Sequence, residues 1–250
     1  MSEERLHRLP SPAGGHALAA LQRGGNGPTV VFLPGLRSDM RGDKATALSE
    51  WAAGRGQAML RLDYSGHGES GGAFTDGGVA TWRDDAARVI EALAPGPVVL
   101  VGSSMGGWIG LMLAARLGER VRGLVGIAAA PDFTAAMRAG LEPAELAAIA
   151  RGEAVLLPAQ PDPLPLTRRF LEEGDASTLL GGPIPVRCPV RLLHGLSDDV
   201  VPWRRATEIA GRVEAEDCRV VLVKNGDHRL SGPAELLLLR DTVAELVGGG

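Results

Sequence analysis

Cysteine is scarce in this sequence, which excludes the disulfide-rich classes of protein. Its 250 residues include two cysteines, Cys188 and Cys218, and each comes just before a predicted strand. Two cysteines cannot form the framework of bonds that small secreted domains need. We expect two buried thiols in a reducing compartment, and a single disulfide stays open if the two strands are neighbours.

An excess of positive charge is also lacking. Lysine and arginine number 26 and aspartate and glutamate 30, which gives a net charge of −4 at pH 7. A chain with this balance has no electrostatic reason to bind nucleic acid. Long apolar runs are missing too, because no stretch reaches the roughly 20 residues of a membrane-spanning helix. We therefore expect a globular protein without a membrane span and without a nucleic-acid partner.

The first residues also lack the features of a targeting segment. They read Met-Ser-Glu-Glu-Arg-Leu-His-Arg, with two acids and no apolar stretch. A secretory signal requires such a stretch, and transit peptides are poor in acids. We therefore expect a cytoplasmic protein.

Motifs for metals and cofactors are missing or incomplete. The sequence has no His-x-x-x-His pair and no paired Cys/His cluster, so it predicts no metal site. Gly66-x-Gly68-x-x-Gly71 matches the dinucleotide fingerprint in its letters and follows a predicted strand. However, no helix is predicted between this glycine loop and about residue 79, and a bound pyrophosphate would lack the helix N-terminus that it requires. We expect no cofactor.

Strands and helices alternate along most of the chain. Apolar strands are predicted at 29–33, 58–62, 98–101, 121–128, 190–193 and 218–223, and helices at 45–51, 79–94, 106–117, 203–213 and 233–247. Repeated β-α units form a parallel sheet that is covered on both faces. Residues 16–22 are predicted to add an antiparallel edge strand. The fold class is therefore α/β, with a mostly parallel central sheet and helices on both faces.

The alternation breaks off between residues 129 and 186. Prolines from Pro143 to Pro185 punctuate short helical stretches, and the segment is rich in alanine and leucine. We interpret 129–186 as a small helical lid inserted into a single domain, whose core is formed by 1–128 and 187–250. Its apolar residues outnumber what short helices can bury among themselves. Most should pack against the core, and we expect the rest to form an acyl pocket near the nucleophile described next.

The most informative segment reads Val-Val-Leu-Val-Gly-Ser-Ser-Met-Gly-Gly over residues 98–107. It places Gly102-x-Ser104-x-Gly106 where a buried strand turns sharply into a helix, which is the pattern of a nucleophile elbow. Such a turn forces strained backbone angles on the serine and leaves no room for side chains two residues before and after it. The sequence therefore predicts Ser104 as a nucleophile.

A serine hydroxyl needs a base, and one of five histidines suits this role best. His228 lies in a loop directly after a predicted strand, and such a loop shares the carboxyl edge of the sheet with Ser104. The chain order Ser-Asp-His is that of the α/β hydrolases. His7, His16 and His67 lie near the N-terminus or in a glycine loop, and His194 is expected to form a hydrogen bond within its own turn.

The base in turn needs an acid, and the residues leave several candidates. Asp198 and Asp199 follow the strand at 190–193, and only one of two adjacent side chains can face His228. Asp132, after the strand at 121–128, is a third candidate. Asp227 adjoins His228 in sequence and would strain to reach its ring. For the oxyanion, we expect donors from the backbone amides of Met105 and Leu36.

These residues resemble the α/β-hydrolase superfamily over nearly the whole chain. The matching motifs are the elbow, Asp63-x-x-Gly66-x-Gly68-x-Ser70 and His194-Gly195-x-x-Asp198-x-x-Val201-Pro202. By the last of these matches, the acid is Asp198 rather than Asp199.

A closer resemblance is to the palmitoyl-protein thioesterases also called mycophenolic acid acyl-glucuronide esterases, which are mitochondrial members of the superfamily. The resemblance is specific because it includes Trp108, Trp203 and Arg229, which the general fold does not require. The matching motifs are Gly102-Ser-Ser-Met-Gly-Gly-Trp108, Pro183-Ile-Pro-Val, Arg191-Leu-Leu-His-Gly, Asp198-Asp-Val-Val-Pro-Trp203 and Asp227-His228-Arg229. Segment 129–186 matches least. The resemblance implies depalmitoylation, with an acylated protein or a small ester or thioester as the substrate.

The sequence thus predicts a serine hydrolase of carboxylic esters or acyl thioesters that forms an acyl-enzyme. Ser104 would attack, His228 would carry the proton and Asp198 would orient His228. A dehalogenase of this fold is excluded because Ser104 stands where an aspartate would be needed. Two alternatives stay open: a ligand-binding receptor with a vestigial hydrolase site, and a perhydrolase or C–C hydrolase with the same triad.

Overall fold

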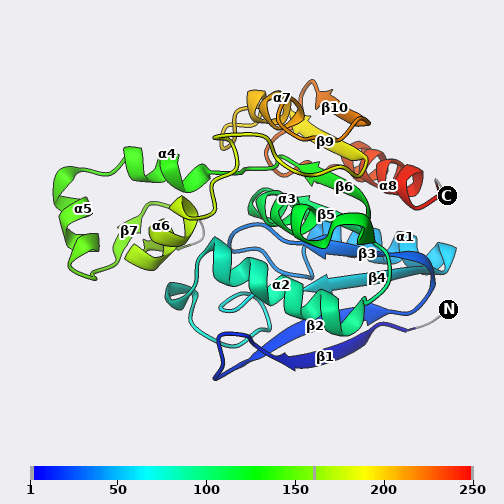
Figure 1. The fold of residues 1–250 in the computed structure, drawn as a ribbon, viewed down its shortest axis with the longest axis horizontal. Helices are drawn as coiled ribbons and strands as arrows, with labels where there is room; N and C mark the ends of the chain where they lie inside the picture. The colour runs from blue at the N-terminus through cyan, green and yellow to red at the C-terminus, as the bar shows by residue number, and fades with distance from the viewer. Residues whose placement is uncertain (1–2, 160–161, 249–250) are drawn as a thin grey trace.

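The centre of the molecule is an eight-stranded sheet, seen in a computed structural model that describes residues 3–159 and 162–248 (Figure 1). The strands in sheet order are β1 (Arg5–Pro10), β2 (Ala17–Arg23), β4 (Gln57–Leu62), β3 (Asn26–Leu33), β5 (Val98–Ser103), β6 (Val121–Ile127), β9 (Val190–Gly195) and β10 (Cys218–Val223). From β4 to β10 all neighbours are parallel, whereas β1 and β2 pair antiparallel. The mostly parallel architecture predicted from the sequence is confirmed.

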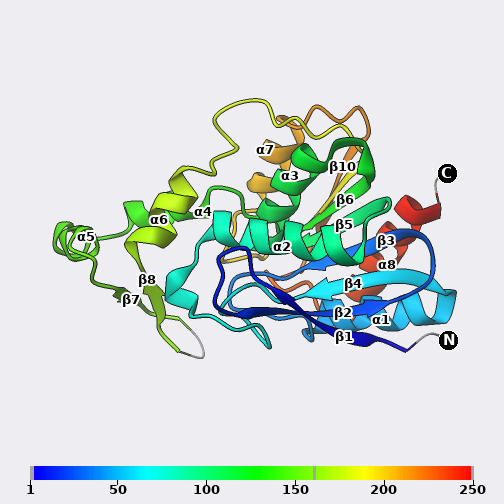
Figure 2. The same ribbon diagram turned by 60° about the horizontal axis from the view of Figure 1, so that its bottom comes forward.

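Helices cover both faces of this sheet (Figure 2). The helices on one face are α1 (Asp43–Arg55) and α8 (Pro233–Gly248), and those on the other are α2 (Val79–Leu93), α3 (Met105–Leu117) and α7 (Arg204–Ala210). Alternate residues of a strand point to opposite faces. Accordingly, Val30 and Phe32 of β3 pack toward α1 and α8, and Val31 and Leu33 pack toward α2 and α3. Burial on both faces explains why the central strands read as continuous apolar runs.

The parallel direction of the strands gathers the functional loops. The loops that follow β3, β5, β6, β9 and β10 all leave the sheet at the same edge, because these strands run in one direction. Ser104 lies in the loop after β5, and His228 in the loop after β10. The fold therefore brings together residues that are far apart in the sequence.

Between β6 and β9 the chain leaves the sheet and forms a separate group of small elements beside it (Figure 1). They are α4 (Phe133–Ala139), α5 (Pro143–Ala150), β7 (Val155–Leu157), β8 (Leu164–Leu166) and α6 (Arg168–Asp175). Strands β7 and β8 form an antiparallel ribbon that the sequence did not predict. Two short 3-10 turns, η1 (Phe74–Asp76) and η2 (Gly118–Arg120), complete the elements.

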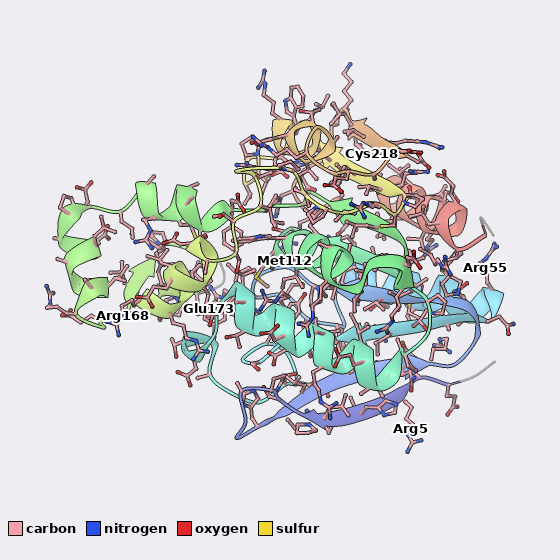
Figure 3. The ribbon with its side chains drawn as sticks, viewed as in Figure 1. Arg5, Arg55, Met112, Arg168, Glu173 and Cys218 are labelled. Atoms are coloured by element: carbon pink, nitrogen blue, oxygen red, sulfur yellow. The ribbon has the colours of Figure 1, made fainter. Side chains whose placement is uncertain are left out.

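Polar contacts fasten this group of elements to the core. Glu173 of α6 points toward the start of α2 (Figure 3), where it accepts hydrogen bonds from the Thr81 amide at 2.8 Å and hydroxyl at 2.7 Å. A carboxylate at this position is also stabilised by the positive end of the α2 dipole. The Trp108 indole of α3 donates to the Ser177 carbonyl at 3.0 Å.

Aromatic side chains add an apolar attachment between the same parts. Phe133 meets Trp108 edge-on with ring centroids 5.5 Å apart, and Phe170 meets Trp82 at 5.8 Å. Phe170 and Leu171 are both buried. These contacts confirm that apolar residues of segment 129–186 pack against the core.

Two details differ from the sequence interpretation. Strand β1 was not predicted, and because it pairs with β2, the segment at 16–22 is not the edge of the sheet. Cys188 and Cys218 are free, as expected, although β9 and β10 are neighbours; the difference is that both are only half-buried. Burial raises the pKa of the Cys188 thiol to about 11.

None of the helices within residues 3–159 and 162–248 combines the length and the apolar character needed to cross a membrane.

Candidate active site

Ser104 occupies a strained turn between β5 and α3. Its backbone angles are φ 53° and ψ −116°, which lie outside the regions that residues other than glycine favour. A Cβ atom added to Gly102 would lie 2.2 Å from the Gly106 carbonyl oxygen, and one added to Gly106 would lie 2.0 Å from the Leu33 oxygen. Both glycines are therefore required by close backbone approach, as the sequence predicted. Strain of this kind, about 1–3 kcal/mol per residue, persists where the surrounding structure fixes it.

An aspartate and a histidine form a hydrogen-bonded pair at the same edge of the sheet. His228 Nδ1 lies 2.9 Å from Asp198 Oδ2, although 30 residues separate the two in sequence. The Asp198 side chain is fully buried, and that of His228 is 23% exposed. The other carboxylate oxygen, Oδ1, accepts the backbone N–H groups of Val200 at 2.9 Å and Val201 at 2.8 Å.

The hydrogen bonds of Asp198 keep it ionised. Burial alone would raise the pKa of this carboxyl. The hydrogen bonds from Val201, His228 and Val200 outweigh burial and hold the pKa below its ordinary value. A buried anion beside an imidazole is the arrangement that stabilises the ring when it takes up a proton.

The other candidate acids are occupied elsewhere. Asp132 accepts the amides of Leu179 and Leu180 at 2.8 Å each and so ties the end of the inserted segment to its beginning. Asp227 accepts the amides of Arg229 and Leu230 at 3.0 Å within its own turn. Asp199 is exposed. Of the acids weighed from the sequence, the structure brings Asp198 to His228.

Ser104 and His228 line one cavity of about 440 Å³, within the range of small-molecule sites. Gly35 and Leu36, from the loop after β3, line it as well. A Cβ added to Gly35 would lie 3.5 Å from the Ser104 Cβ, so this loop adjoins the serine directly. Met105 is the first residue of α3 and is buried. The loop after β3 and the start of α3 therefore flank Ser104 from two sides.

The lining of this cavity is largely polar. Its charged residues are Arg37, Asp39, Asp43, Lys44 and Arg229. The Lys44 ammonium donates to the Arg229 carbonyl, and burial lowers its pKa. Among the described residues of segment 129–186, which exclude 160–161, none lines this cavity, so the expected acyl pocket built by that segment does not appear here.

His194 is the residue that sequence reasoning undervalued. It does form the expected hydrogen bond within its turn, since Nε2 lies 2.9 Å from the Val201 carbonyl oxygen. The same nitrogen also lies 3.1 Å from Asp198 Oδ2. The signal that could have found it is the spacing His194-x-x-x-Asp198, which places the histidine at the end of a strand and the acid in the following turn.

The glycine loop after β4 folds around an aspartate. Asp63 accepts the amides of Met40 at 2.6 Å and Glu69 at 2.8 Å. A Cβ added to Gly68 would lie 2.1 Å from Asp63 Oδ2. This glycine is therefore explained by the close approach of the Asp63 carboxylate.

Comparison with known proteins agrees with this fold. A family model described as alpha/beta hydrolase fold matches residues 28–143. A solved structure of alpha/beta hydrolase domain-containing protein 10 from mouse superposes with a TM-score of 0.88 and 37% identity, covering 98% of both chains. A structure from Agrobacterium vitis S4, described as a hydrolase, superposes with a TM-score of 0.92 and 37% identity, covering 99% of both chains. The class defined by fold and elbow is the α/β hydrolases.

Sequence similarity specifies the branch of that class. The mouse palmitoyl-protein thioesterase ABHD10 is 39% identical over 226 residues, which cover 89% of this chain and 76% of that protein. The human protein of the same name is 39% identical over 227 residues, with coverage of 89% and 74%. The chain belongs to the ABHD10 family of α/β hydrolases.

The same comparison corrects one prediction. Both ABHD10 proteins are named as mitochondrial, which contradicts the cytoplasmic location predicted from the first residues. That prediction was wrong because it relied on what a short terminal stretch lacks.

Proposed function

We propose that this protein is a serine hydrolase that cleaves carboxylic esters and acyl thioesters through an acyl-enzyme on Ser104. The observation that supports this most directly is the Asp198–His228 hydrogen bond of 2.9 Å at the cavity that Ser104 also lines. The names of the ABHD10 relatives support the same class of substrate.

The proposed reaction begins with proton transfer. In the neutral ring, His228 Nδ1–H donates to Asp198, which leaves Nε2 as the acceptor. Ser104 Oγ attacks the acyl carbonyl carbon while its proton passes to Nε2. Asp198 holds the ring in this tautomer and stabilises the imidazolium that forms.

The carbonyl oxygen becomes an oxyanion in this step. The amides proposed to receive it are those of Met105, at the start of α3, and Leu36, in the loop beside Ser104. Backbone donors fixed in advance stabilise the developing charge without reorganisation. Their role requires no particular side chain at either position.

The second half of the reaction releases both products. His228 returns its proton to the leaving alcohol or thiol as the bond to the acyl carbon breaks. Water then attacks the acyl-enzyme, His228 accepts its proton, and that proton passes to Ser104 Oγ as the carboxylic acid leaves. No redox partner is needed for this cycle.

We propose that segment 129–186 acts as a lid over this site. The segment begins at the elbow, since the Ala130 amide donates to the Ser104 carbonyl at 3.1 Å. A Cβ added to Gly107 would lie 2.5 Å from the Ala129 Cβ. Movement of the inserted elements would therefore displace backbone that contacts the nucleophile directly.

For the acyl group, we propose long fatty chains, including palmitoyl groups on protein cysteines, as the names of the relatives suggest. The test compares a palmitoyl oxyester, a palmitoyl thioester and an S-palmitoylated peptide, together with labelling by a fluorophosphonate probe. We expect labelling at Ser104 and turnover of at least the thioester. Labelling without turnover of any ester or thioester would instead support a ligand-binding role.

A further inference from the structure

A second histidine contacts the acid of the proposed active site. His194 is the fifth residue of β9, and its side chain is 1% exposed. Its Nε2 lies 2.9 Å from the Val201 carbonyl oxygen and 3.1 Å from Asp198 Oδ2. Asp198 Oδ2 therefore has an imidazole nitrogen on each side, that of His228 at 2.9 Å and that of His194.

These distances determine which nitrogen of His194 carries hydrogen. Both neighbours of Nε2 are oxygen atoms that can only accept, so a lone pair on Nε2 would face two negative atoms. The ring must carry its hydrogen on Nε2. In the neutral ring the lone pair is then on Nδ1, which is buried and has no partner within the described residues.

The consequence is that Asp198 has no freedom to turn. Its Oδ1 accepts the Val200 and Val201 amides, and its Oδ2 lies between the two histidines. The Val201 carbonyl, which accepts the hydrogen bond from His194 Nε2, belongs to the same turn. His194 thus holds this turn against the end of β9 through the Val201 carbonyl, and the same Nε2 lies 3.1 Å from the carboxylate.

We infer that His194 is a positioning residue for the proposed active site: its Nε2–H fixes the Asp198 carboxylate in the orientation that receives His228. The inference rests on the proposed function of Ser104, His228 and Asp198. An apolar residue of similar size would fill the same space in the core. It would not supply the N–H group that binds the Val201 carbonyl oxygen beside Asp198 Oδ2.

The experiment compares two substitutions that differ in the donor. Glutamine places an amide nitrogen the same number of bonds from the backbone as Nε2, so His194→Gln retains a donor. His194→Met fills the volume without one. We expect His194→Met to lower kcat on the order of 10- to 100-fold, the range found for residues that orient a ligating histidine. We expect KM to change little and His194→Gln to restore most of the loss.

The pH profile separates positioning from loss of packing. Without the His194 N–H, fewer donors offset the negative charge of Asp198, and the carboxylate therefore attracts protonated His228 more strongly. The midpoint of the acid limb of kcat/KM should therefore move to higher pH in His194→Met and stay near the wild-type midpoint in His194→Gln. The charged groups that share the cavity with His228 are Arg37, Asp39, Asp43, Lys44 and Arg229, and both variants leave them unchanged.

Leu193→Ala is the matched control. Leu193 is buried on the opposite face of the same strand, in contact with the cluster of α1 and α8. The Leu193→Ala substitution should lower Tm and leave the midpoint of the pH profile unchanged. An unshifted midpoint and an undiminished kcat in His194→Met, with wild-type hydrolysis intact, would overturn the role of His194. Absence of wild-type hydrolysis and of labelling at Ser104 would overturn the proposed function itself.

A measurement on the wild-type protein covers the case in which His194→Met does not fold. Nitrogen-15 NMR of labelled histidine distinguishes the two tautomers of a neutral ring. We expect hydrogen on Nε2 of His194 and on Nδ1 of His228. Hydrogen on Nδ1 of His194 in the neutral ring would contradict it.

Discussion

The side chain of Asp198 is fully buried, yet it forms a 2.9 Å hydrogen bond to His228, whose ring is partly exposed. The pair thus connects the interior of the protein to the cavity that Ser104 lines. The partly exposed ring can exchange protons with a substrate, whereas the Asp198 side chain has no contact with solvent. This difference in exposure supports separate roles for the two residues.

The first prediction concerns the two adjacent aspartates. Asp198→Asn should lower kcat on the order of 10⁴-fold, because an amide that donates to His228 Nδ1 stabilises the wrong tautomer. Asp199→Asn should leave kcat within a few-fold of wild type, because Asp199 is exposed. Steady-state kinetics on one thioester compares them. Equal losses in the two variants would refute the assignment of the acid.

The second prediction concerns the two adjacent serines. Ser104→Ala should lower turnover on the order of 10⁴-fold or more and abolish labelling by a fluorophosphonate. Ser103→Ala is the control, because Ser103 is the last residue of β5 and lies before the strained turn. Circular dichroism should show both variants folded. Retention of labelling in Ser104→Ala would mean that another residue is the nucleophile.

The elbow could be predicted from sequence because its requirements are local. Gly102 and Gly106 are needed wherever a strand turns this sharply, whatever the rest of the chain does. The choice between Asp198 and Asp199 was not local. It depends on the turn that directs two amides at Asp198 and on His194 in the preceding strand, and only the resemblance to a family decided it in advance.

The missed elements have a different cause. Strand β1 carries arginines and a histidine on an edge that is largely exposed, so it shows no clear apolar period. The lining of the cavity comes from loops after separate strands, and its charges could not be assigned until those loops were placed. Long-range juxtaposition, rather than local preference, determines these features.

The third prediction uses the glycines of the elbow. Gly106→Ala should destabilise the protein by several kcal/mol or prevent folding, because the new Cβ would lie 2.0 Å from the Leu33 oxygen. Gly54→Ala is the control: it lies within α1 with nothing within 4 Å, and should stabilise by about 0.4–1 kcal/mol. Urea unfolding measures both. A neutral Gly106→Ala would contradict the tight approach of α3 to β3.

The fourth prediction follows from the lowered pKa of Asp198. A carboxyl with a lowered pKa in the folded state adds stability that is fully present above its ordinary value of 3.8 and is lost as pH falls through the folded pKa. The stability of the wild type relative to Asp198→Asn should therefore shrink as the solution is acidified below that value. Urea midpoints of both proteins across an acidic series measure the difference. A difference that stays constant through this range would count against the effect of the hydrogen bonds on Asp198.

The last prediction concerns acyl length. Each methylene that leaves water on binding contributes about 0.8 kcal/mol, or roughly fourfold in kcat/KM. If the acyl chain is buried beneath the inserted segment, kcat/KM should rise from acetyl through butyryl to octanoyl thioesters with one common leaving group, and level off or fall once the space is filled. The polar cavity beside Ser104, with Arg37, Lys44 and Arg229 in its lining, would then receive the leaving group.

A matched pair of leaving groups tests that division of the site. A neutral and an anionic thiol joined to the same octanoyl group should differ in KM. The anionic one should be favoured, because the three cations of the lining outnumber its two aspartates, and added salt should reduce the difference. The slope with acyl length should be the same for both thiols, because it depends on a different part of the site. A steady decline of kcat/KM from acetyl onward would exclude a buried acyl chain and leave an enzyme for small esters.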